Sequence, residues 1–207
     1  MSEILLKEIK FPINSSELKI SSTFLSDNEI PKIFIKIINT LKTNKMDYNI
    51  SISLYLYRIK FLLEKNKKKK FERKSTIFDS YYLHKQDIDK TIEKIFNIFN
   101  VDGQIIILSL YLLEKIIIKN KIILDEINLL KIVVISLIET IKFNVDNYDT
   151  DGKLICSILR IKKDMLINLE LEFLGFIDYR LKVDEDKFFK YKQKIMILWI
   201  DYLKDSL

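Results

Sequence analysis

Apolar residues recur at helical spacing through most of the chain. Between residues 87 and 181 this pattern predicts five consecutive helices. The second (104–119) and third (125–143) are apolar on most faces, which is typical of helices surrounded by other helices. The fourth covers about 152–161, and the fifth begins after Asp164, a predicted N-cap. The apolar stripes of the first and fifth helices consist of Ile88, Ile92, Ile95 and Phe99, and of Leu166, Leu169, Phe173 and Phe176.

The flanking segments predict further helices. Isoleucines at helical spacing between Ile30 and Leu41 predict one, after a polar arm over residues 1–28. Residues 49–64 fit both strand alternation and the helical period, and we expect a helix because a lone strand would have no partner. The last helix has a predicted core stripe of Phe188, Tyr191, Ile195, Leu198 and Tyr202, with Trp199 alongside and Lys187, Lys190 and Lys194 facing water.

These segments give four parts: an arm (1–28), N-terminal helices with a Lys-rich linker (29–76), a five-helix unit (77–182) and a C-terminal helix (183–207). The composition favours an all-α fold. Only 3 Gly and 2 Pro are present among 207 residues, whereas β-architectures of this size need many Gly- or Pro-containing turns.

The charge and cysteine content describe the expected surroundings of the protein. The net charge is +6, with basic residues concentrated only at Lys65 and over 67–70, so an acidic partner is allowed but not required. The single cysteine, Cys156, indicates a reducing compartment, and we expect an intracellular protein of the nucleus or cytoplasm. The longest apolar runs fall far short of the roughly 20 residues that a membrane span needs, so no membrane association is expected.

No constellation of residues predicts catalysis. One Cys and one His, far apart in sequence, do not supply a metal site. A Gly-rich phosphate loop is missing, and Ser109 and Ser136 lie in apolar helices without a neighbouring His. His84 is interpreted as a loop residue and Cys156 as a core residue. We therefore expect a protein that is not an enzyme and that needs no cofactor, metal ion or small-molecule ligand.

Two landmarks in the five-helix unit resemble the cyclin box, especially that of the P/U-type cyclins related to fungal phosphate-starvation cyclins. The third helix ends in Lys142 followed by an aromatic residue and then polar or acidic residues, and the fifth contains Leu-Glu followed by Glu-Phe-Leu over 169–174. The separation between Lys142 and Glu170 also suits the family. Upstream, Phe78-Asp79-Ser80 resembles a short Phe-x-Ser signature. The resemblance spans roughly residues 78–200, and no single motif in it is specific.

This resemblance implies an all-α fold with a single five-helix cyclin box and extra N-terminal and C-terminal helices. It implies a regulatory subunit that forms a heterodimer with a cyclin-dependent protein kinase and activates it. In cyclins, the matching Lys and Glu hydrogen-bond to the kinase near its mobile regulatory helix, and neighbouring apolar residues pack against that helix. The residues that the resemblance assigns to kinase binding are Lys142, Phe143, Glu170, Leu174, Tyr179 and Leu181.

The resemblance also implies an internal ion pair, and the chain departs from the family at two places. The family's Arg to Asp pair would fall at Lys94 and Glu114, which keep the charges. The family's Gly pair between the fourth and fifth helices is replaced by Leu159-Arg160, so we expect a different turn there. Asn97 and Asn100 stand where a substrate-recruiting patch would be apolar, and recruitment through such a patch is not expected.

Two other functions are compatible with the sequence. A cyclin-fold adaptor that binds nucleic acid or acts in transcription would use Lys65 and the lysines of 67–70 as phosphate contacts. We regard nucleic-acid binding as the weaker hypothesis, because a run of Lys in a loop is usually only solvated. A helical scaffold without a kinase partner is the third possibility.

Overall fold

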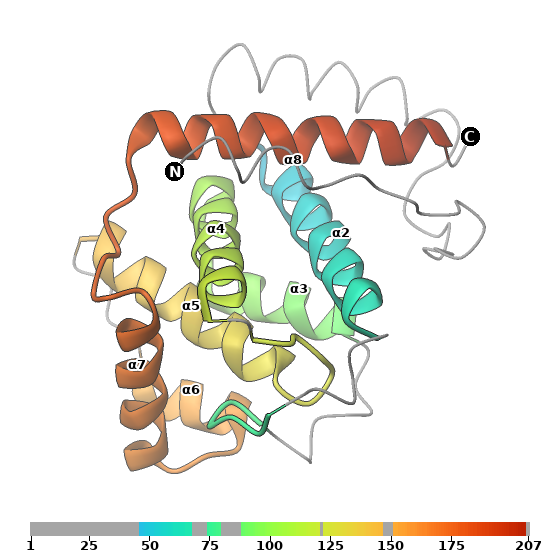
Figure 1. Ribbon diagram of the computed structural model, residues 1–207. Coiled ribbons are helices and arrows are strands. Elements are labelled where there is room, and N and C mark those ends of the chain that lie inside the picture. The colour runs from blue at the N-terminus through green and yellow to red at the C-terminus, as the bar shows by residue number, and fades with distance from the viewer. Residues whose placement is uncertain (1–45, 68–73, 80–87, 121, 147–150, 206–207) are drawn as a thin grey trace.

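A computed structural model describes residues 46–67, 74–79, 88–120, 122–146 and 151–205. Within these residues the chain forms helices and no strands, as the sequence predicts. The five helices predicted between residues 87 and 181 are present, and they are flanked by one long helix on each side (Figure 1). The helices are α2 (Tyr48–Lys67), α3 (Ile88–Phe99), α4 (Gly103–Asn120), α5 (Leu129–Asn144), α6 (Gly152–Leu159), α7 (Lys163–Phe176) and α8 (Glu185–Asp205).

The centre of the molecule is the pair α4 and α5. These two helices pack extensively on each other, and α2 packs along the other side of α4. Residues Ile132–Ile141 of α5 are all buried, whichever way they point. The prediction that the second and third helices of the five would be enclosed is therefore confirmed. Burial of such branched side chains contributes most of the stability of a bundle of this kind.

Helix α2 settles the ambiguous segment in favour of a helix. Most residues from Ile50 to Ile59 are buried, which explains why no single period stands out in the sequence. Asp47 immediately precedes the helix, and its carboxylate accepts a hydrogen bond from the backbone N–H of Ile50 at 3.0 Å. This is the usual way of satisfying a free donor at a helix start.

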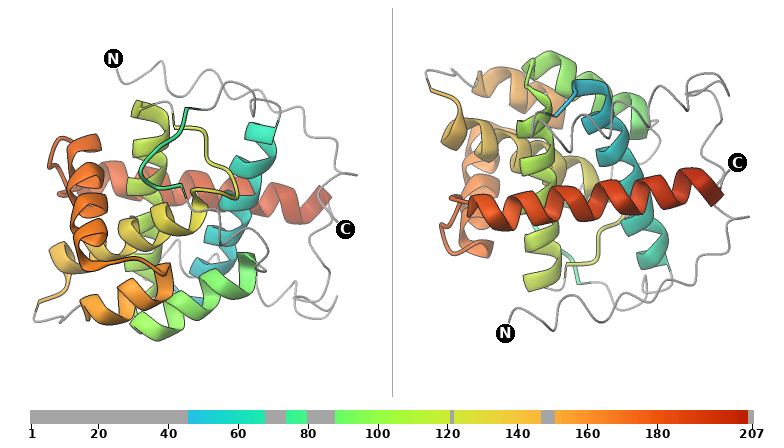
Figure 2. Two further views of the ribbon diagram at one scale, coloured as in Figure 1. Left: turned by 90° about the horizontal axis from the view of Figure 1, so that it is seen from below. Right: turned by 90° about the horizontal axis from the view of Figure 1, so that it is seen from above.

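Helix α8 crosses one end of the bundle and contacts both α2 and α4 (Figures 1 and 2). Its fully buried apolar residues are Phe188, Ile195, Met196 and Trp199. Tyr191, Leu198 and Tyr202 of the predicted stripe are half-buried and pack against the core. Lys187 and Lys190 are exposed as predicted, and Lys194 is half-buried.

Helix α7 packs against α4, α5 and α6 with the predicted residues Leu166, Leu169 and Phe173 buried. The predicted N-cap is wrong. Lys162 occupies the cap position and Asp164 lies in the first turn, where its charge still favours the positive end of the helix dipole. Phe176, at the other end, is half-buried and contacts Phe78, with the ring centroids 6.0 Å apart.

The short segment 74–79 is held against the bundle by contacts of Phe78 and Asp79. Phe78 is buried, and the ammonium of Lys131 donates to the backbone carbonyl of Asp79 at 2.6 Å. Lys131 is itself buried within α5, and burial lowers the pKa of its ammonium. Phe78 of the Phe-x-Ser signature is thus a core anchor.

The turn after α6 uses the left-handed conformation. Arg160 has a φ of 53°, and its backbone N–H donates to the carbonyl of Ser157 at 3.3 Å. A conformation that favours glycine is therefore adopted here by an arginine. The arm over 1–28, the helix expected near Ile30–Leu41, Lys68–Lys70, Ser80 and His84 lie outside the described residues.

Candidate functional site

Lys142 and Glu170 lie on different helices and bind each other. Lys142 is in the last turn of α5 and Glu170 is in the middle of α7. The ammonium Nζ of Lys142 donates to Oε1 of Glu170 at 2.6 Å. Both side chains keep part of their surface in solvent, with exposed fractions of 35% and 20%. The structure therefore brings together the two charges that the sequence singled out, at a place accessible to a partner.

A third charge, Glu139, lies beneath this pair. Glu139 is one turn before Lys142 on α5 and is buried, and its Oε1 is 3.3 Å from Nζ of Lys142. Burial raises the pKa of the Glu139 carboxyl, the charge of Lys142 opposes this, and the charge of Glu170 adds to it. Burial lowers the pKa of Lys142, but the two carboxylates outweigh it, so the pKa of the ammonium is raised. Lys142 thus stays charged, held between two carboxylates.

Exposed apolar side chains lie on the same two helices as the pair. Residues 167, 170, 171 and 174 share one face of α7, because residues three and four apart are neighbours on a helix. Ile167 and Leu171 are 44% and 51% exposed, and Leu174 is half-buried. Phe143, which follows Lys142 on α5, is 49% exposed. We call this surface the Lys142–Glu170 face and define it as Lys142, Phe143, Ile167, Glu170, Leu171 and Leu174.

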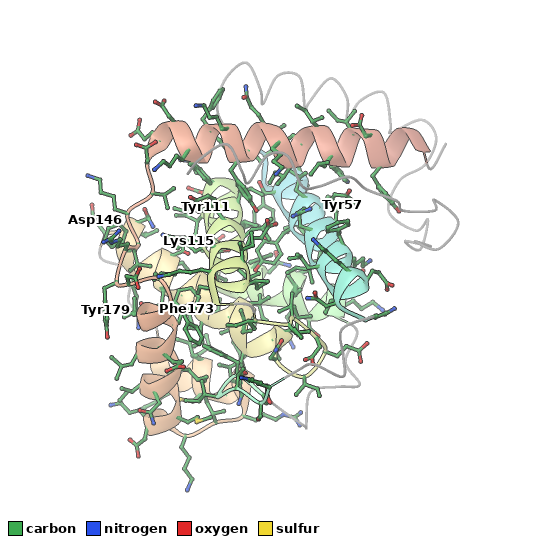
Figure 3. The ribbon with its side chains drawn as sticks, in the orientation of Figure 1. Tyr57, Tyr111, Lys115, Asp146, Phe173 and Tyr179 are labelled. Atoms are coloured by element: carbon green, nitrogen blue, oxygen red, sulfur yellow. The ribbon has the colours of Figure 1, made fainter. Side chains whose placement is uncertain are left out.

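Tyr179 and Leu181 lie beyond the end of α7 and differ in exposure. Tyr179 is 68% exposed, and Figure 3 shows its side chain directed away from the bundle. Leu181 is half-buried and packs against the hydrophobic core. Of the six residues that the sequence assigned to partner binding, Phe143 and Tyr179 are therefore the most available large side chains.

The predicted ion pair between Lys94 and Glu114 is wrong. Glu114 of α4 is bound by Arg58 of α2 through two hydrogen bonds, Nε to Oε1 at 2.8 Å and Nη2 to Oε2 at 3.0 Å. Lys94 is on the exposed side of α3. A residue that pairs with the buried Glu114 must reach the interior of the bundle. Arg58 does so because α2 packs along α4, whereas Lys94 faces solvent.

The sequence reasoning missed Arg58, Glu139 and Lys131, which are all buried charged residues. One signal could have found them. Each lies in a run of apolar residues on a helix that is enclosed on most sides, where a charge has no route to solvent and must be paired.

Metal-binding groups do not assemble within the described parts of the chain. No group of three His, Cys, Asp or Glu side chains is close enough there to hold a metal ion. Cys156 is half-buried on α6 beside the core. Ser109 and Ser136 are buried and serve the backbone: the Ser136 hydroxyl donates to the carbonyl of Ser109 at 2.7 Å. The serines therefore support helix packing.

No family model and no curated protein sequence matches the chain. Among the described helices, none combines the length and apolar character that crossing a membrane requires.

Proposed function

We propose that the chain is a cyclin-like regulatory subunit that binds a cyclin-dependent protein kinase and activates it. The observation that supports this most is the Lys142–Glu170 pair itself. Two helices bring its charges to 2.6 Å from each other, and both helices also carry exposed apolar side chains. In the family that the sequence resembles, the matching Lys and Glu bind the kinase.

The physical character of the Lys142–Glu170 face suits a docking surface for a helix. Exposed apolar side chains grouped around a charged centre are typical of protein interfaces, because the apolar groups supply binding free energy and the charges fix the orientation. Ile167, Leu171 and Phe143 would pack against the partner. Lys142 and Glu170 would hydrogen-bond to its backbone or polar side chains.

Activation would follow from the position of the docked helix. In protein kinases, an ion pair between a conserved Lys and a Glu on the mobile regulatory helix must form before phosphoryl transfer becomes efficient. A subunit that holds this helix inward shifts the kinase toward its active state. The chain would then contribute no catalytic group of its own.

The adaptor hypothesis gains no support from the described residues. The structure describes Lys65 and Lys67 of the lysines that this hypothesis uses, and Lys67 is paired with Glu64. The pair is on the exposed end of α2 and takes up part of the positive charge that a phosphate would need.

Reconstitution with purified kinases tests the proposal. The chain is mixed with each cyclin-dependent kinase of its source cell, and complex formation and phosphorylation of a generic substrate peptide are measured. We expect one kinase to form a 1:1 complex and to gain activity by orders of magnitude. Absence of binding to every such kinase, or phosphoryl transfer by the chain alone, would contradict the proposal.

A further inference from the structure

The turn that follows α7 is built in an unusual way. Asp178 and Tyr179 both have positive φ, 54° and 58°. The backbone N–H of Tyr179 donates to the carbonyl of Leu174 at 2.8 Å, and that of Asp178 donates to the carbonyl of Gly175 at 3.1 Å. This is the Schellman pattern of helix ending, which needs only one left-handed residue, here Asp178. The left-handed conformation of Tyr179 is therefore additional, and for a bulky residue it is unfavourable.

Two lysines of α4 hold this turn in place. Lys119 forms an ion pair with the carboxylate of Asp178. Lys115 reaches the carbonyl oxygen of Arg180 with its Nζ at 3.5 Å, and Figure 3 shows its side chain extending from α4 toward the segment between α7 and α8. The turn is therefore fixed to the bundle while Tyr179 stays 68% exposed. Strained backbone of this kind persists where surrounding structure enforces it, and it is concentrated at functional sites.

The same turn concentrates positive charge. Lys115, Lys119, Arg180 and Lys187 form what we call the Arg180 cluster, and Asp178 is the carboxylate bound within it. Burial lowers the pKa of Lys115, and the charges of Lys119, Arg180 and Lys187 lower it further. The side chains of Arg180 and Lys187 are exposed, and neither has an ion-pair partner among the described residues. The cluster thus contains positive charges that no ion pair among the described residues neutralises. A bound anion would reduce the repulsion between them.

We propose that the Arg180 cluster, with the ring of Tyr179, is a docking site for a phosphorylated peptide segment. Lys115 lies near enough to Lys119, Arg180 and Lys187 to feel their charges, and a guanidinium with neighbouring ammonium groups suits a phosphate dianion, which accepts several charge-assisted hydrogen bonds at once. The exposed Tyr179 ring offers an apolar surface to a side chain next to the phosphorylated residue.

The surrounding charges favour a single phosphate group over a nucleic acid. Asp184, Glu185 and Asp186 come just before Lys187 and are exposed. A polyanion extends over a longer stretch of surface than one phosphate group does, so it would meet more repulsion from these carboxylates. The inference does not depend on kinase binding, because it uses residues outside the Lys142–Glu170 face.

The test measures retention of peptides on the immobilised full-length chain. The probes are a degenerate peptide pool with one central phosphoserine or phosphothreonine, the same pool without phosphate, and a twelve-residue oligothymidylate. We expect the phosphorylated pool to be retained at least roughly tenfold more than the unphosphorylated pool. Arg180→Gln and Lys115→Gln should each reduce retention about tenfold, whereas Lys153→Gln, an exposed lysine on α6, should not.

Three outcomes would overturn the inference. One is equal retention of the two pools, and another is an equal loss in Lys153→Gln, which would show unspecific attraction to positive charge. The third is tighter binding of oligothymidylate that depends on the same residues, which would identify a nucleic-acid site. The Glu170→Gln variant should retain the phosphorylated pool normally, so failure of this inference and failure of the kinase proposal are distinguishable.

Discussion

Arg58 of α2 and Glu114 of α4 form a buried ion pair with two hydrogen bonds, at 2.8 and 3.0 Å. The pair joins the two helices on which α8 lies. Burial raises the pKa of the Tyr191 hydroxyl of α8, and the charge of Glu114 raises it further, which places this hydroxyl beside the pair. One ionic contact in the core thus lies where three helices meet.

Removing one member of this pair should destabilise the fold strongly. Arg58→Met leaves the carboxylate of Glu114 buried without its partner, and such a loss typically costs about 3 to 5 kcal/mol of unfolding free energy. Urea denaturation followed by circular dichroism measures it. The double variant Arg58→Met/Glu114→Leu should recover much of the loss, because no charge then remains buried. Lys94→Ala is the control and should change stability by less than about 0.5 kcal/mol. If Lys94→Ala were as damaging as Arg58→Met, the pairing seen here would be wrong.

The sequence predicts the helices better than it predicts their charged contacts. Periodicity identifies α3 to α8 because each has at least one apolar face, and it leaves α2 ambiguous because that helix is buried nearly all round. The assignment of Lys142 and Glu170 to one surface followed from a resemblance, and their contact with each other was not predicted, because 28 residues separate the two in sequence. The partner of Glu114 was misassigned because a sequence gives the charge of Lys94 but not the direction in which it points. Glu139 was missed because its role depends on the burial that α5 acquires only in the bundle.

Replacing Glu139 by Gln should stabilise the protein at neutral pH. Burial raises the pKa of this carboxyl, so the folded chain retains a proton at pH values where the unfolded chain, with a pKa of about 4.3, has lost it. The free energy of unfolding should therefore fall as the pH rises from about 4.3 through the folded pKa. Glu139→Gln removes the ionisable carboxyl, so the variant does not lose this unfolding free energy as the pH rises.

The measurement is the melting temperature between pH 4 and pH 7. We expect the variant to exceed the unmodified chain at pH 7 and the difference to shrink toward pH 4. Glu172→Gln, an exposed residue of α7, should show no such trend. A lower melting temperature of Glu139→Gln at pH 7 would mean that the bond from Lys142 outweighs the cost of burial.

A glycine at position 160 should also stabilise the fold. Arg160 is exposed and has a φ of 53°, a conformation that costs a residue with a Cβ about 1 kcal/mol more than it costs glycine. Arg160→Gly should therefore raise the unfolding free energy by about 1 kcal/mol in a thermal or urea melt. Arg160→Ala removes the guanidinium but keeps the Cβ, and it should leave stability nearly unchanged. Equal effects of the two variants would show that the backbone is not strained there.

The Lys142–Glu170 pair should matter much more for partner binding than for folding. Glu170→Gln is the cleaner probe, because Lys142 also neutralises the buried Glu139 and its removal would disturb the core. The pair is partly solvated, so its loss should cost at most about 1 kcal/mol of stability. In a kinase complex the same pair would be desolvated, and truncating one member typically costs about 2 to 5 kcal/mol, which is a roughly thirtyfold to several-thousandfold loss of affinity.

Isothermal titration calorimetry with the reconstituted kinase, beside melts of the free chain, separates the two effects. Glu172→Gln on the same helix should bind normally. If Glu170→Gln bound the kinase as tightly as the unmodified chain, the pair would be only a surface contact between α5 and α7, and the kinase would have to dock elsewhere.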